Sequence, residues 1–129
     1  MIGLDTNVLV RYFVDDDENQ HKIARQLINQ NNVYITNIVL VESYWVMKRL
    51  YKLDRQQLIT LFACLLAMSN AEFENEVVFA NAFIKFKALN CDFADVFIGT
   101  LHHYRGIKTA SFDRRAISQL DFVNAAEFV

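Results

Sequence analysis

The chain has 129 residues, the length of one domain, and 53% of them are hydrophobic, which indicates a folded globular protein rather than a disordered one. A net charge of −2 gives no overall basic character typical of nucleic-acid binding, although clustered carboxylates would mask local positive charge. Cys64 and Cys91 are too few for a disulfide or metal framework. Neither a membrane span nor a secretory signal is predicted, so we expect a cytoplasmic protein with free thiols.

Short strands are predicted to alternate with longer helices. The strands are expected at 1–4, 33–36, 69–73 and 107–110, with a small edge strand at 122–125. The helices are expected at 8–13, 19–29, 38–51, 55–67, 74–89, 92–105 and 113–119. Thr36 and Asn37 are both candidate N-caps of one helix, Asp54 is the predicted N-cap of the next, and Gly106 is a predicted C-terminal cap. This alternation predicts an α/β fold with a parallel sheet and helices on both faces.

Four acids stand in settings where ordinary patterning would not place a charge. Asp5 ends the first strand, Glu42 interrupts IVLVESYWV, Asp95 lies in DFADVFI, and Asp113 follows the fourth strand. A buried carboxylate costs several kcal/mol unless it has a partner. For each acid taken alone, a structural role explains its position at least as well as a role in a functional site. Asp5 or Asp113 could cap a helix, Glu42 could pair with an Arg, and Asp92 with Asp95 could sit at a helix dipole.

Taken together, the four acids favour a site. If the first and fourth strands are neighbours, acids at their carboxyl ends converge on one edge of the sheet. Two carboxylates about 4 Å apart repel by about 4 kcal/mol at an effective dielectric near 20, so four ionised acids need a cation. Oxygen ligands without Cys or His suit Mg²⁺ or Mn²⁺. Such ions activate water for displacement at phosphorus, so the residues predict metal-assisted hydrolysis of a phosphodiester.

The segments that carry these acids resemble a known family. LDTNVLVRYF, LVESYWVMKRLYKLDRQQL, DFADVFIGTLHHYRG and ASFDRRA, in this order, are similar to the PIN domain and, more narrowly, to VapC-type toxin ribonucleases of bacterial type II toxin–antitoxin pairs. The resemblance implies a single PIN domain over residues 1–129. Its expected fold is a three-layer α/β/α sandwich with a mainly parallel sheet of four to five strands and about seven helices. It implies an endoribonuclease dependent on Mg²⁺ or Mn²⁺, an RNA substrate, a homodimer and a cognate VapB-like antitoxin.

The resemblance also assigns the acids. Asp5, Glu42, Asp95 and Asp113 match the family's catalytic positions. Asp5, Asp95 and Asp113 are the expected metal ligands, with Glu42 as a further candidate. Asp92 is expected to cap a helix rather than to bind the metal directly.

Several neighbouring residues are expected to support this site. Thr6 and Asn7 would orient Asp5 or a metal-bound water. Ser111 stands where the family often has Thr and keeps a hydroxyl. Gly99 stands where the family often has Ala and should allow close packing near the site. Three arginines flank the site segments and are candidates for RNA phosphates, with ordinary solvated side chains as the alternative: Arg11, Arg114 and Arg115.

Two other interpretations remain open. An aspartate-nucleophile phosphatase or a phospho-acceptor domain would use Asp5 to attack phosphorus. Such phosphatases usually carry a second Asp two residues on, where this chain has Asn7. A non-catalytic PIN-like module would only bind RNA or a partner, and would have no reason to keep four acids that repel one another.

Overall fold

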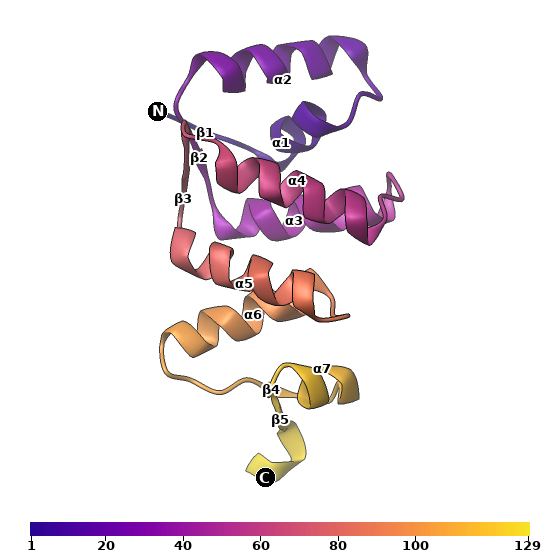
Figure 1. Cartoon of the computed structure of the whole chain (residues 1–129), viewed down its shortest axis with the longest axis vertical. Coiled ribbons are helices and arrows are strands. Elements are labelled where there is room, and N and C mark those ends of the chain that lie inside the picture. Colours follow the sequence, from indigo (N-terminus) through magenta and orange to yellow (C-terminus); the bar gives the residue numbers. More distant parts are fainter. The chain divides into compact units, whose positions relative to one another are not determined.

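Strands of two or three residues alternate with longer helices along the chain, as the sequence predicts (Figure 1). The computed structural model describes residues 1–129 and contains two compact units. We call these the N-terminal unit, Met1–Glu76, and the C-terminal unit, Val77–Val129.

The N-terminal unit is built on a parallel sheet with the strand order β1-β2-β3. These strands are β1 (Ile2–Gly3), β2 (Val33–Ile35) and β3 (Ala71–Phe73). Val33 pairs with Ile2 on one side and with Ala71 on the other. The central strand β2 is buried because its β-branched residues are covered by helices. The carboxyl ends of β1 and β2 lead directly into helices, so both ends are placed where a parallel sheet presents its functional groups.

Four helices complete this unit: α1 (Thr6–Phe13), α2 (Glu18–Gln30), α3 (Asn37–Arg49) and α4 (Arg55–Ala67). Helix α1 packs against α2 and α3, and α3 packs against α4. Tyr44 of α3 stacks on Phe62 of α4 with ring centroids 6.3 Å apart. Helix α4 begins with a capping box between Asp54 and Gln57, which satisfies backbone donors at its first turn.

The C-terminal unit contains α5 (Glu76–Ala88), α6 (Phe93–Tyr104), β4 (Ala110–Ser111), α7 (Arg114–Gln119), β5 (Val123–Asn124) and a 3₁₀ helix (Ala125–Phe128). Its core is aromatic. The ring of Phe93 lies against Phe86 and Phe97, with centroids 5.5 Å apart in each pair. Strand β4 pairs with β5 in a second parallel sheet.

The predicted α/β class and the order of elements are confirmed, and so is the N-cap Asp54. Of the two candidates Thr36 and Asn37, Thr36 is the N-cap and Asn37 is the first residue of α3. Gly106 has a φ of +72°, which fits its predicted role in ending α6. Two expectations were wrong. The fourth strand lies at Ala110–Ser111 rather than 107–110. A single sheet of four to five strands was expected, whereas the N-terminal unit contains a three-stranded sheet and the C-terminal unit a two-stranded sheet. Strands of two residues make too few ladder bonds to fix a pairing from sequence alone.

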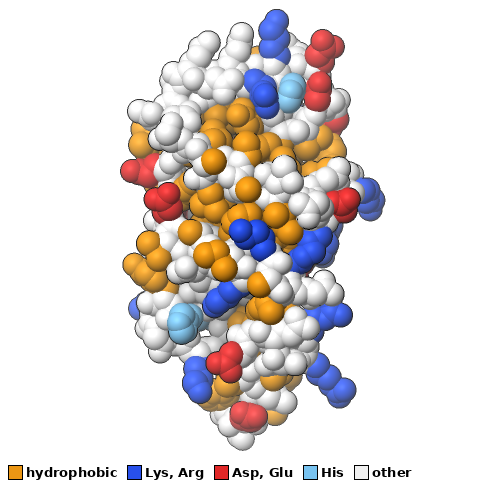
Figure 2. All heavy atoms as spheres, viewed as in Figure 1, with side chains coloured by type: hydrophobic (Ala, Val, Ile, Leu, Met, Phe, Trp, Pro, Cys, Tyr) orange, Lys and Arg blue, Asp and Glu red, His pale blue; other side chains and the backbone are white.

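The surface mixes charged and apolar side chains. On the face drawn in Figure 2, hydrophobic side chains reach the surface of both units among Lys, Arg, Asp and Glu. Phe112 is the most exposed aromatic residue, at 83%. None of the helices combines the length and the apolar character needed to cross a lipid bilayer.

Candidate active site

Asp5 lies at the junction of β1 and α1, and its carboxylate is not used by the helix. Its backbone carbonyl accepts hydrogen bonds from the N–H groups of Val8 and Leu9, at 3.1 and 3.3 Å. Its exposed side chain makes no capping hydrogen bond. At six other helices the N-cap side chain accepts a backbone N–H, and these N-cap residues are Asp17, Thr36, Asp54, Asp92, Asp113 and Asn124. The capping interpretation of Asp5 is therefore wrong, and its carboxylate is available to a ligand.

Glu42 is held by Thr6 across the N-terminal unit. The Thr6 hydroxyl donates to Glu42 Oε1 at 3.0 Å and joins the first residue of α1 to the middle of α3. Thr6 is only 8% exposed, whereas Glu42 is exposed. We expected Thr6 to orient Asp5 or a water, and we considered an Arg partner for Glu42. The hydroxyl instead fixes one carboxylate oxygen of Glu42, because consecutive positions at a helix start point in different directions.

Three acids meet in the C-terminal unit. Asp92, Asp95 and Asp113 line a pocket of about 200 Å³, together with Cys91, Arg115, Ala116 and Leu120. Asp92 Oδ1 accepts the Ala94 N–H at 2.8 Å, which confirms the predicted cap. Asp113 Oδ1 accepts the Ala116 N–H at 3.0 Å, so this acid caps α7 as well. Asp95 is half-buried in the first turn of α6, where the helix dipole favours a negative charge.

Of the expected supporting residues, Ser111 and Arg115 lie near the acids of the C-terminal unit, whereas Asn7 lies at a groove of the N-terminal unit. Ser111 Oγ accepts the backbone N–H of Asp113 at 2.9 Å, so its hydroxyl shapes the turn that presents this acid. Arg115 lines the acid pocket, and Arg114 is exposed beside it. Asn7 is exposed and lines a groove between α1 and α2. One predicted arginine therefore lies beside the acids within its own unit.

Arg11 is tied into a network within the N-terminal unit. Its Nε donates to Gln20 Oε1 at 2.8 Å, and its Nη1 contacts Asp16 and Tyr51. The Tyr51 hydroxyl donates to Asp16 Oδ2 at 2.6 Å. This hydrogen bond, followed by the charge of Arg11, holds the pKa of Asp16 below its usual range, and the bond to Tyr51 raises the pKa of Arg11. Because Arg11 already pairs with an acid, it is less available to an RNA phosphate than Arg114 or Arg115.

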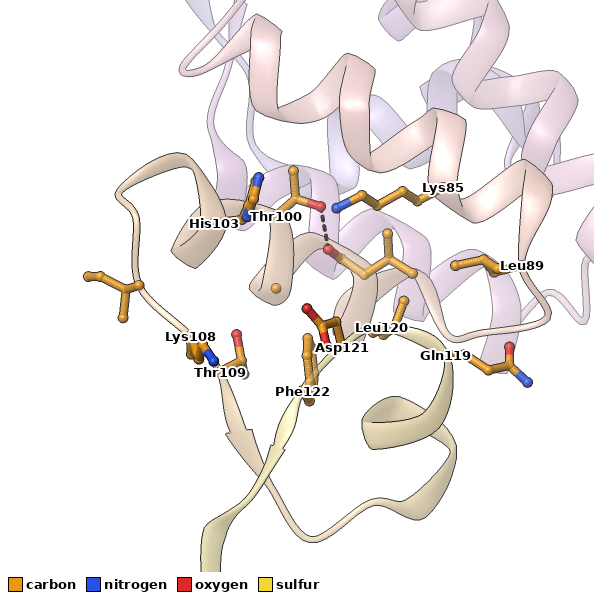
Figure 3. Close-up of a pocket in the computed structure, with 13 residues that line it drawn as sticks. Lys85, Leu89, Thr100, His103, Lys108, Thr109, Gln119, Leu120, Asp121 and Phe122 are labelled. Carbon is orange, nitrogen blue, oxygen red and sulfur yellow. Dashed lines mark hydrogen bonds between the residues drawn. The ribbon is translucent and has the colours of Figure 1, made fainter. Parts of the chain in front are cut away.

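The close packing predicted at Gly99 is observed. A Cβ at this position would lie 2.3 Å from Cε1 of Phe122 and 2.8 Å from its Cζ. The two residues border a second cavity of the C-terminal unit, about 280 Å³ in volume and drawn in Figure 3, which is rimmed by Lys85, His103 and Lys108. Asp92, Asp95 and Asp113 do not line this cavity. Gly99 therefore accommodates an aromatic ring rather than the acids themselves.

The candidate acids offer carboxylate oxygens, the donor type that Mg²⁺ and Mn²⁺ prefer. No group of three or more acidic, His or Cys side chains is arranged to hold an ion in this structure. Magnesium is commonly bound through only one or two carboxylates, with water and substrate phosphates completing its shell. Zinc would need several His or Cys ligands around one point. The pattern of oxygen donors therefore suits Mg²⁺ or Mn²⁺ better than zinc.

The chain is an α/β protein in which an acid follows two of the parallel strands, Asp5 after β1 and Asp113 after β4. The sequence matches the PIN domain over residues 2–123, nearly its whole length, and the chain belongs to the PIN domain family. Family membership supports a ribonuclease activity. Among solved structures, the toxin VapC20 of Mycobacterium tuberculosis, described as cleaving the sarcin-ricin loop, is 17% identical, with a TM-score of 0.45 over 97% of this chain and 98% of that one. A search of the curated proteins finds no match.

Proposed function

We propose that the chain is a metal-dependent endoribonuclease in which Asp5, Glu42, Asp95 and Asp113 are the catalytic acids. Asp5, Asp95 and Asp113 would bind Mg²⁺ or Mn²⁺, with Glu42 as a further ligand. The observation that carries the proposal is the carboxylate of Asp5, which follows a parallel strand and is left unused by the helix that it begins. A carboxylate in that position is suited to ligand binding.

Each residue has a defined part in the proposed reaction. When bound, the cation would lower the pKa of a water molecule and offset the charge that develops on the phosphate. Thr6 occupies Oε1 of Glu42, which leaves Oε2 to accept a proton from the attacking water or to bind the ion. Asp113 Oδ1 accepts the hydrogen bond that caps α7, which leaves Oδ2 for a ligand. Arg115, beside the acids of its unit, would bind a phosphate of the RNA.

Cleavage of RNA by the purified chain tests the proposal. We expect single-stranded RNA to be cut in the presence of Mg²⁺ or Mn²⁺ and to stay intact with a chelator. Asp5→Asn should abolish cleavage. Asp17→Asn is the matched control, because Asp17 is also the N-cap of a helix and an amide keeps its cap. Cleavage that persists in both Asp5→Asn and Asp95→Asn would show that these acids do not bind a catalytic metal.

The same preparations separate the ribonuclease from a phosphatase. If Asp5 were a nucleophile, incubation with a small phosphodonor would leave a phosphoryl group on it, detectable as a mass increase that Asp5→Asn removes. We expect no such adduct. We expect Mn²⁺ instead to raise the melting temperature of the wild type, as a ligand of the folded state must, and to do so less in Asp5→Asn.

We further propose that the enzyme is the toxin of a toxin–antitoxin pair and works as a homodimer. The support is the resemblance of its four acidic segments to VapC-type toxins. Expression of the chain alone should arrest growth, and co-expression with the product of the neighbouring reading frame should restore it and yield a co-purifying complex. Light scattering measures the dimer directly. Growth arrest that persists in Asp5→Asn would disconnect toxicity from the proposed site.

A further inference from the structure

Phe112 is an exposed aromatic ring directly beside a proposed catalytic acid. Eight of the eleven phenylalanines are buried, and only Phe112 and Phe128 are exposed, at 83% and 67%. Phe128 lies in the 3₁₀ helix, whereas Phe112 lies between β4 and α7. The chain buries most of its phenylalanines, yet one of the two exposed rings stands immediately before Asp113.

The turn that carries Phe112 is fixed on both sides. Ser111 belongs to β4 and pairs with Asn124 of β5. The Ser111 hydroxyl then accepts the N–H of Asp113, and Asp113 accepts the N–H of Ala116 at the start of α7. Phe112 stands between two residues whose side chains are both engaged with the backbone. Its ring is thus held outward on an ordered turn and is poorly placed to fold back onto the core.

The surroundings of the ring match a nucleic acid strand. Arg114 and Arg115 follow Asp113, and Arg115 lines the same pocket as Asp95 and Asp113. An aromatic ring next to cationic side chains is the usual arrangement for single-stranded nucleic acid, in which bases stack on the ring and phosphates contact the cations. Without a bound cation the carboxylates of this pocket repel phosphates, so groups at its border are needed to hold the RNA strand.

We propose that Phe112 stacks against an unpaired base of the RNA, next to the phosphate that is cut. This inference rests on the proposed ribonuclease function and assigns a substrate-positioning residue to it. A base inside a duplex is stacked on both faces, so only a nucleotide in a loop, a bulge or a single strand can use the ring. Phe112 therefore contributes to the binding of unpaired nucleotides beside the proposed site.

Binding and cleavage of one RNA by four proteins test this inference. Phe112→Leu keeps an apolar side chain without a stacking face, Phe112→Trp keeps the face, and Phe128→Leu is the matched control at the other exposed phenylalanine. Removing a stacking ring costs about 1–3 kcal/mol per base, so Phe112→Leu should lower kcat/KM on single-stranded RNA about 5- to 150-fold. Phe112→Trp should restore it, and Phe128→Leu should match the wild type. Duplex RNA should be a poor substrate for all four proteins.

Two readouts keep this inference separate from the proposed function. In chelator, RNA carrying 2-aminopurine reports stacking without cleavage, and its fluorescence should be quenched by the wild type and by Phe112→Trp but not by Phe112→Leu. The melting shift caused by Mn²⁺ should be equal in all four. If the wild type fails to cut RNA yet quenches the probe, the ribonuclease proposal fails and base stacking stands. If Phe112→Leu cuts and quenches as Phe128→Leu does, the inference is overturned. Loss of antitoxin binding with unchanged cleavage would overturn it in favour of a protein contact.

Discussion

Replacing Gly99 by Ala should destabilise the protein, although alanine is the better helix former. In a helix interior the exchange favours folding by about 1 kcal/mol. Against this, the new Cβ would lie 2.3 Å from Cε1 of Phe122, far inside contact distance. Phe122 is only 8% exposed, so its ring cannot swing into solvent without losing its packing. Overpacking costs about 1–3 kcal/mol, and so deep an overlap belongs at the upper end, which leaves a net loss of about 2 kcal/mol.

A double-mutant cycle isolates the cause of this loss. Phe122→Ala removes the ring, so Gly99→Ala in that background should be neutral or stabilising by up to about 1 kcal/mol. Urea denaturation followed by circular dichroism gives the free energy of unfolding of all four proteins. If Gly99→Ala costs the same with and without the Phe122 ring, the overlap is not the reason for the loss, and our account of this packing is refuted.

Three further predictions concern hydrogen bonds. Thr6→Val should lower RNA cleavage about tenfold, because it removes the hydrogen bond that holds Glu42. Thr6→Ser keeps a hydroxyl and should cleave RNA as the wild type does. Equal cleavage by the two variants would show that Thr6 does not support the site. Asp113→Asn and Asp113→Ala should both abolish cleavage, but thermal melting should show a loss of about 1 kcal/mol only for the alanine, which cannot cap α7. Tyr51→Phe removes the main cause of the lowered pKa of Asp16, so it should destabilise the fold at neutral pH. That difference should vanish in melts taken well below pH 3.8, where Asp16 is protonated in the folded and unfolded chains.

Local signals in the sequence were sufficient for most elements. The sequence predicts helix α4 with its observed bounds, because Asp54 is a favoured N-cap residue at the break before an unbroken helical run. The structure adds that Asp54 and Gln57 form a capping box there. The division of the strands into two sheets was not predictable, since pairing between distant segments depends on contacts that no local pattern records. The same holds for β4, where the residues after Gly106 have strand propensity but the strand is limited to Ala110 and Ser111, which pair with Val123 and Asn124.

The candidate acids were found because a charge inside an apolar run stands out. The sequence does not distinguish the acids whose side chains cap a helix from those that do not, because Asp is suited both to capping and to metal binding. The side-chain hydrogen bonds decide this for Asp92 and Asp113, which cap, and for Asp5, which does not. The sequence contains no pattern that marks Phe112 as a candidate binding residue. Its exposure depends on how the chain folds and is seen only in the structure.

The missing cap on α1 has a consequence for how this protein would evolve. A side-chain cap contributes about 1 kcal/mol to a helix, and α1 begins without one although an aspartate stands at the right position. Under the proposed function, the Asp5 carboxylate is kept for a ligand and the helix forgoes this stabilisation. Selection for thermal resistance alone would then favour substitutions at Asp5, and the proposed function predicts that the enriched variants would be stable and would not cleave RNA.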